Sequence, residues 1–157
     1  MQKRIDSAIK ALIILLLVSC YLLFDSLYTN PMIYMFFHKN IFHLLGNCFW
    51  LLFIPNLKRN ILPAYVIAVS ASILTPEYTV GFSGVLMALV GINLSDNRFI
   101  GRKCSRFLLV LSAVTFGLSF LLPNVASFVH AFSIVLGYLY SIIRRIFNDY
   151  RAAYTGK

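Results

Sequence analysis

The sequence is short of charge, and above all of negative charge: only five of its 157 residues are Asp or Glu, against fourteen Lys or Arg. Charged residues make up 12% of the chain, hydrophobic residues make up 60%, and the mean hydropathy is +0.82. A water-soluble domain of this size needs more polar surface than this composition can supply. The shortage therefore excludes an ordinary soluble domain and indicates one membrane domain, residues 1–157.

Patterns typical of disulfides, metal sites and nucleic-acid binding are also missing. The three cysteines, two of them in apolar stretches, suggest no disulfide framework; they are Cys20, Cys48 and Cys104. None of the three histidines has a nearby cluster of carboxylates or thiols, so we expect no metal site. The basic residues are spread over four short segments rather than gathered in one patch, so we expect no nucleic-acid partner.

Long apolar runs are what the sequence has instead. A helical span needs roughly 17–25 mostly apolar residues. Six segments meet or nearly meet this length, at about 8–24, 40–56, 61–75, 81–95, 105–122 and 125–143. Helix breakers or charges separate them, namely Asn30-Pro31, Pro55-Asn56 with Lys58-Arg59, Pro76-Glu77, Asp96 to Arg106, and Pro123-Asn124. We therefore predict an all-α membrane protein, a bundle of six transmembrane helices.

The basic residues predict how this bundle is oriented. With both termini in the cytoplasm, thirteen of the fourteen Lys and Arg residues fall on the inner side and only Lys39 falls outside. The positive-inside rule requires this bias, and the charge also favours contact with the anionic headgroups of the lipid bilayer. The first segment has a basic start but no small-residue cleavage pattern, so we expect it to be a retained span.

Polar side chains inside a span are costly and usually face the interior of the bundle, and four of those in the predicted spans are informative. They are His43, Asn47, Ser83 and His130. The second, fourth and sixth spans all run inward from the outer side, and each carries its polar residues near its start. The topology therefore brings all four to a similar depth near the outer face.

The residues around these four also suggest a site. Gly81-Phe82-Ser83-Gly84 places a serine between glycines where a loop enters a helix, which permits a tight turn and exposes backbone N–H groups to a developing anion. Small residues four apart, Gly84 with Ala88 and Ser133 with Gly137, let the fourth and sixth spans approach closely. Taken singly, each motif is also explained by helix packing or a structural hydrogen bond. Neither explanation accounts for the joint placement of the motifs at one depth.

At these residues the sequence resembles the rhomboid family. His43 followed four residues later by Asn47, with His38 five residues earlier, is similar to the second-span motif of that family. The Gly81–Gly84 stretch is similar to its nucleophile motif, and His130 with Ser133 and Gly137 is similar to its sixth-span motif. The resemblance covers residues about 30 to 140 in the correct order.

The resemblance implies an intramembrane serine protease that cleaves transmembrane protein substrates with a Ser83–His130 dyad and needs no cofactor. It implies that His43 and Asn47 stabilise the oxyanion, and that the protein lies in a bacterial inner membrane with its site open to the periplasm. Met87 stands where many members carry a tyrosine, Val80 where a second glycine is common, and the first outer loop, about residues 26–39, is short. The supporting positions are His38, Gly81, Gly84, Met87, Ser133 and Gly137.

Two other functions are compatible with parts of this pattern. An inactive relative that binds transmembrane clients would keep the bundle but lose the reaction. A small transporter would use His43, Asn47 and His130 as a polar pathway, and would need polar residues in the inner half of the bundle. The candidates there are Ser70, Ser72, Asn93 and Ser112. The sequence does not predict an oligomeric state.

Overall fold

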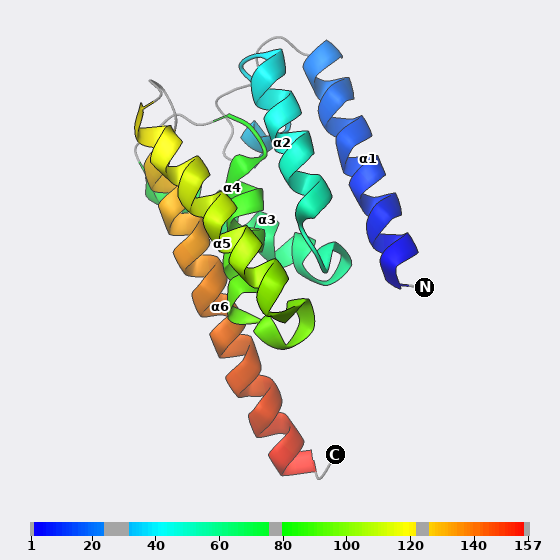
Figure 1. Ribbon diagram of the computed structural model, residues 1–157, viewed down its shortest axis with the longest axis vertical. Helices are drawn as coiled ribbons and strands as arrows, with labels where there is room; N and C mark the ends of the chain where they lie inside the picture. The colour runs from blue at the N-terminus through cyan, green and yellow to red at the C-terminus, as the bar shows by residue number, and fades with distance from the viewer. Residues whose placement is uncertain (1, 24–31, 76–79, 122–125, 156–157) are drawn as a thin grey trace.

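The computed structural model describes residues 2–23, 32–75, 80–121 and 126–155, and in these ranges the regular structure is all helical (Figure 1). Six α-helices follow one another, with one 3-10 turn, η1 (Tyr34–Phe36), between the first two. The helices are α1 (Gln2–Leu23), α2 (Ile41–Phe53), α3 (Leu57–Leu74), α4 (Ser83–Ser95), α5 (Asn97–Leu121) and α6 (Ser127–Thr155). The predicted six-helix fold is confirmed. The predicted breaks at Asn30-Pro31, Pro76-Glu77 and Pro123-Asn124 lie outside the described residues.

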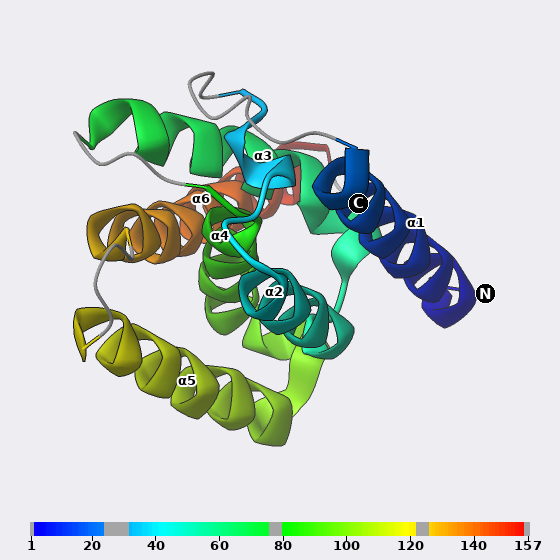
Figure 2. The same cartoon turned by 90° about the horizontal axis from the view of Figure 1, so that it is seen from above.

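Several of the helices suit a membrane by length and composition. Within the described ranges, three stretches are long and apolar enough to cross a bilayer, Arg4–Leu23, Leu57–Leu74 and Ser127–Thr155, and α2 and α4 are shorter apolar helices. The 13 residues of α4 extend only about 20 Å. Every residue from Gly84 to Asn93 is nevertheless buried, and Figure 2 shows α4 in the middle, with α2, α3, α5 and α6 around it. A helix enclosed by protein has no need to match the thickness of the lipid.

The ends of several helices differ from the predicted spans. Helix α3 begins at Leu57, so Lys58 and Arg59 belong to its first turn rather than to a separator. Helix α5 begins at Asn97, which makes most of the predicted 96–106 separator helical, and α6 continues past residue 143 to Thr155. Hydropathy marks only the apolar part of a helix. Lys and Arg are good helix formers, so the backbone stays helical where the side chains become polar.

Contacts at one end of the bundle join α1, α2 and α3. The ammonium group of Lys10 donates a hydrogen bond of 2.7 Å to the carbonyl of Leu52, near the end of α2. The backbone N–H of Lys58 donates to Oδ1 of Asp6 at 3.1 Å. The basic residues at the start of α1 and the start of α3 therefore lie at the same end of the bundle, as the predicted alternation of charge requires.

Helices α4 and α6 make the closest helix pair, and glycine allows it. A methyl group on Gly91 would overlap the carbonyl oxygen of Ile134, and one on Gly137 would overlap the carbonyl oxygen of Ala88. Backbone therefore meets backbone at two levels of the pair. Because Ser83 starts α4 and His130 lies in the first turn of α6, this contact fixes the distance between the two side chains.

We expect Gly91→Ala to destabilise the fold, because the added methyl group would force α4 and α6 apart. Overpacking of this kind costs typically about 1–3 kcal/mol. The measurement is the unfolding midpoint of the purified protein titrated from a mild detergent into a denaturing one. A methyl group on Gly46 in α2 or on Gly117 in α5 would meet nothing within 4 Å, so Gly46→Ala and Gly117→Ala are the matched controls and should keep the wild-type midpoint or raise it slightly. An unchanged midpoint for Gly91→Ala would contradict the close approach.

Candidate active site

A tight turn places Ser83 at the first position of α4. Gly81 has φ of +104°, a backbone conformation that residues with a side chain rarely adopt. Its N–H donates a 3.3 Å hydrogen bond to the carbonyl of Tyr34, and the next residue, Phe82, is buried. The turn is thus held at two points. Ser83 then begins a helix whose first N–H groups have no intrahelical acceptor and whose positive end favours an anion.

His130 meets Ser83 across the bundle. It lies one turn into α6, where its N–H donates to the carbonyl of Ala126 at 3.2 Å. Its ring nitrogen Nε2 is 2.8 Å from the Oγ of Ser83, a hydrogen-bond distance. His130 is buried, with 6% of its surface exposed, whereas Ser83 is partly exposed. The two residues predicted to form a dyad are therefore in contact, and the serine can still be reached.

The positions of the protons in this pair follow from which of its atoms can donate a hydrogen bond and which can accept one. Nε2 can accept the hydroxyl proton of Ser83 only when the ring carries its proton on Nδ1. The Nδ1 atom of His130 is buried and has no hydrogen-bond partner among the residues the structure describes. In that part of the chain no carboxylate orients the ring, so the arrangement is a two-residue pair in which packing holds the imidazole.

Two further side chains from α2 face the turn before Ser83. Asn40 caps α2, because its side-chain oxygen accepts the N–H of His43 at 2.9 Å, and this fixes where the helix begins. A methyl group placed on Gly81 would lie 2.6 Å from Nε2 of His43 and 3.2 Å from Nδ2 of Asn47. Both predicted oxyanion residues thus point nitrogen atoms at the same turn. Only glycine leaves room for them there.

His38 holds Asn47 in place. Its Nε2 atom accepts a 2.9 Å hydrogen bond from the amide Nδ2 of Asn47, and its ring packs edge-on against His43 with centroids 5.2 Å apart. Burial lowers the pKa of the His38 imidazole, with a smaller contribution from His43, and this favours the neutral ring that can accept a hydrogen bond. An amide has two N–H groups. His38 takes one and leaves the other for a further acceptor.

The remaining predicted positions support the two helices. A methyl group on Gly84 would lie 3.0 Å from the hydroxyl of Tyr34, and Gly137 packs against the backbone of α4. Met87, one turn after Ser83, is buried in the main core cluster. Ser133, one turn after His130, is fully buried, and its hydroxyl has no hydrogen-bond partner within the described ranges. Val80 is partly buried just before the turn.

Tyr34 is a supporting residue that the sequence did not reveal. It is buried, its hydroxyl donates to the carbonyl of Ala68 at 3.2 Å, and its own carbonyl accepts the N–H of Gly81. Burial raises the pKa of Tyr34 to about 12, so the hydroxyl remains a donor at neutral pH. Tyr34 therefore ties η1 to both α3 and the turn before Ser83. An aromatic residue in a loop carries no spacing signal that could have pointed to this role.

Comparison with known proteins is consistent with this geometry. The family model described as the Rhomboid domain matches residues 25–147 of the chain. The matched range runs from before η1 into α6 and includes the residues that form the candidate site, His38, His43, Asn47, Ser83 and His130. No curated protein sequence gives a significant match.

Proposed function

The chain belongs to the rhomboid family, and from that premise we propose that it is an intramembrane serine protease with Ser83 as its nucleophile and His130 as its general base. The observation that carries the proposal is the 2.8 Å contact between the Oγ of Ser83 and Nε2 of His130. Its substrates are membrane proteins that are cleaved in or near a transmembrane segment. A nucleophile in hydrogen-bond contact with a base is the common arrangement of covalent hydrolases.

The proposed reaction has two stages. His130 takes the proton of the Ser83 hydroxyl as Oγ attacks the substrate carbonyl, and the same proton then passes to the leaving amine as the peptide bond breaks. A water molecule, deprotonated in turn by His130, then attacks the acyl carbon on Ser83; the bond from that carbon to Oγ breaks, His130 returns the proton to Oγ, and the second product leaves with a new carboxyl end. Both stages pass through a tetrahedral intermediate with a negatively charged oxygen.

The groups that would serve as donors to that oxygen lie around the turn before Ser83. The backbone N–H of Ser83 lies at the positive end of α4, and the side chains of His43 and Asn47 face Gly81. Such groups accelerate the reaction because they are positioned before the charge develops. We assign these three groups to the oxyanion pocket, with His38 keeping the Asn47 amide turned toward it.

We also propose that the dyad opens toward the outer side of a bacterial inner membrane, with both termini in the cytoplasm. The support is the charge at the other end of the bundle. Arg59 of α3 and Arg144 of α6 both contact Asp96, just after α4, and Lys10 contacts the end of α2. Basic residues are retained on the cytoplasmic side of a membrane protein.

The structure gives little support to a transport pathway. The four residues named as candidates for such a pathway each donate to a carbonyl of their own helix, Ser70 to Val66, Ser72 to Val69, Asn93 to Leu89 and Ser112 to Leu108, and Asn93 donates also to the carbonyl of Pro55. Side chains satisfied in this way do not form a chain of sites for a solute. An inactive relative is the alternative that experiment must separate from a protease.

Labelling with a serine-directed fluorophosphonate distinguishes an active protease from an inactive relative. The Oγ of Ser83 would attack phosphorus and expel fluoride, so we expect mass spectrometry of the purified protein to find the phosphonyl group on the peptide containing Ser83. Labelling should fall by at least about a hundredfold in His130→Ala, since general-base assistance typically contributes about 10²–10⁴ in rate. Labelling spread over several serines, or unchanged in His130→Ala, would count against the dyad.

A further inference from the structure

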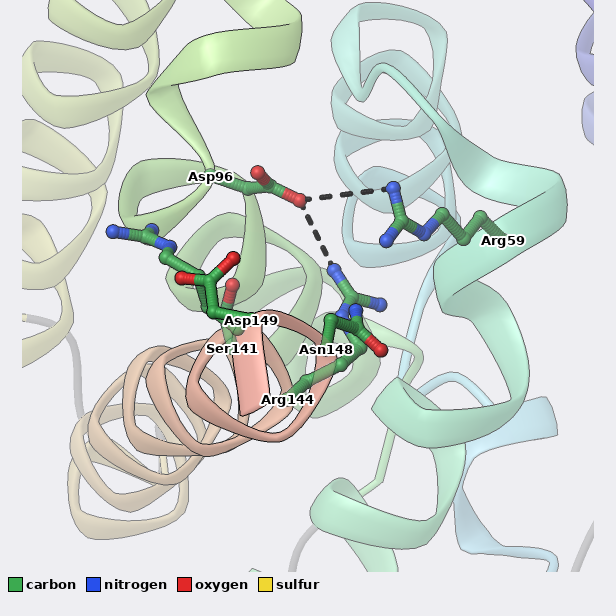
Figure 3. Close-up of a pocket in the computed structure, with 7 residues that line it drawn as sticks. Arg59, Asp96, Ser141, Arg144, Asn148 and Asp149 are labelled. Carbon is green, nitrogen blue, oxygen red and sulfur yellow. Dashed lines mark hydrogen bonds and ion pairs between the residues drawn. The ribbon is translucent and has the colours of Figure 1, made fainter. Parts of the chain in front are cut away.

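A polar cavity lies at the end of the bundle opposite Ser83 and His130 (Figure 3). Its volume is about 190 Å³, and a single water needs only about 10–15 Å³ of such space, so a larger polar group fits. Residues of α3 and α6, together with the residue that follows α4, line the cavity: Arg59, Asp96, Ser141, Arg144, Arg145, Asn148 and Asp149. Fourteen residues of α6 separate His130 from Arg144, about 21 Å along the helix.

A hydrogen-bonded cluster gives the cavity its shape. Arg144 donates from Nη2 to Oδ2 of Asp96 at 3.1 Å and from Nη1 to Oδ1 of Asn60 at 3.0 Å. Figure 3 shows the same carboxylate oxygen joined to Arg59, whose Nη1 lies 4.0 Å away. Arg145 donates to the backbone carbonyl and the hydroxyl of Ser95, the last residue of α4. These bonds hold three elements in one arrangement.

The lining of the cavity carries more positive than negative charge. Three guanidinium groups face two carboxylates, Asp96 and Asp149, which leaves a net positive charge. Each guanidinium offers five N–H groups in a planar fork. One oxygen of Asp96 serves both Arg59 and Arg144. The fork geometry of arginine matches the oxygens of a phosphate group, whose negative charge would offset this excess.

The depth of the cavity points to lipid as the source of that phosphate. With 29 residues, α6 is about 43 Å long, longer than the hydrocarbon core of roughly 30 Å. Arg144 lies about 26 Å from the start of the helix, close to the inner edge of that core, within reach of the headgroup phosphates for a long side chain. Ile143 and Phe147, on either side of Arg144 along the chain, are 59% and 73% exposed and offer an apolar surface to acyl chains. A soluble phosphate would have no use for such a surface.

We propose that this cavity binds a phosphate group, supplied by the headgroup of an anionic phospholipid such as phosphatidylglycerol. The guanidinium groups of Arg59 and Arg145 contribute to holding it, while Arg144 and Asp96 keep the cavity in shape. A zwitterionic headgroup binds more weakly, because its ammonium group meets a cavity that is already positive. The site is independent of the catalytic proposal, since the cavity shares no residue with the dyad or the oxyanion pocket.

The test uses the full chain purified in a mild detergent and titrated with phosphatidylglycerol or phosphatidylcholine, with bound lipid counted by native mass spectrometry. We expect saturable binding of phosphatidylglycerol, at least tenfold tighter than that of phosphatidylcholine. Arg59→Gln should weaken it about tenfold, the effect of losing one charge-assisted contact. Arg59 is 42% exposed, so its replacement should leave the fold intact. Arg145→Lys keeps the charge but not the fork and should weaken binding less.

Arg102→Gln is the matched control, because it removes the same charge from the exposed surface of α5, outside the cavity. Equal loss of binding in Arg102→Gln and Arg59→Gln, or no saturable binding at all, would overturn the proposal. A further arm adds inorganic phosphate or glycerol 3-phosphate at millimolar concentration. Displacement of phosphatidylglycerol by either would overturn the assignment of lipid as the source, whereas retention of the lipid supports it.

Discussion

Replacement of Ser83 by alanine is expected to abolish cleavage of a transmembrane reporter protein while leaving the bundle folded. The Ser83 hydroxyl is the nucleophile of the proposed reaction, and its Oγ is the atom that contacts His130. Removing the nucleophile of a serine hydrolase leaves only the contribution of binding and the oxyanion pocket, so we expect a loss of at least about 10³-fold. The measurement is the initial rate of cleavage in proteoliposomes, followed on a gel.

The matched control is Ser70→Ala, which removes a hydroxyl that donates to the Val66 carbonyl of its own helix. It should keep the wild-type rate within a factor of about two, since changes remote from the site usually have little effect. An unfolding midpoint equal to that of the wild type would show that Ser83→Ala acts on the reaction and not on the fold. Cleavage that persists in Ser83→Ala would remove the serine from the mechanism.

Much of the fold could be predicted because each helix leaves a local signal. Apolar runs separated by prolines and charges marked all six helices, and burial of apolar residues on every side explains why the short α4 could still be recognised. Helix ends were less accurate. The predicted sixth span ended at 143, but α6 continues to Thr155, because hydropathy follows contact with lipid whereas the helix follows backbone hydrogen bonding.

The sequence predicted which residues gather at the candidate site because the order of the spans determines how deep in the membrane each side chain lies. Ser83 and His130 lie 47 residues apart, yet each lies in the first turn of a helix that the predicted topology starts on the outer side, and the structure brings Oγ and Nε2 to 2.8 Å. Contacts across loops had no such signal. The bond from Gly81 to Tyr34 depends on how two loops fold over the bundle, and no periodicity links those residues. Their catalytic roles remain predictions for the experiments above.

The arginine cluster at the other end of the bundle is another set of contacts that the sequence did not predict. From the sequence, Arg59 and Arg144 are predicted only to lie on the inner side, and Asp96 only to belong to a separator between two spans. The structure separates them from the other basic residues by giving them partners and a cavity. A charge count predicts on which side of a membrane an arginine lies. It does not predict whether that arginine faces water, lipid or another side chain.

Gly81→Ala is expected to have the second large effect, because one methyl group disturbs both the backbone and the oxyanion pocket. With φ of +104°, alanine is strained at this position, at a cost of order 1–3 kcal/mol. The methyl group would also lie 2.5 Å from Cε1 of His43 and must push that ring aside. Loss of one oxyanion donor typically lowers the rate about 10²–10³-fold. We therefore expect kcat for the reporter to fall by this factor, with KM nearly unchanged.

A double-mutant cycle with Asn47→Ala tests whether Gly81 acts through the pocket. Asn47→Ala alone should also lower kcat by about 10²–10³-fold. If both changes disable the same pocket, the double variant should lose little more than either single variant, because residues that act as a unit are not additive. Gly46→Ala, which adds the same methyl group to α2 in open space, should keep the wild-type rate. Fully multiplicative losses would mean that Gly81 affects the reaction by another route, such as the tie to Tyr34.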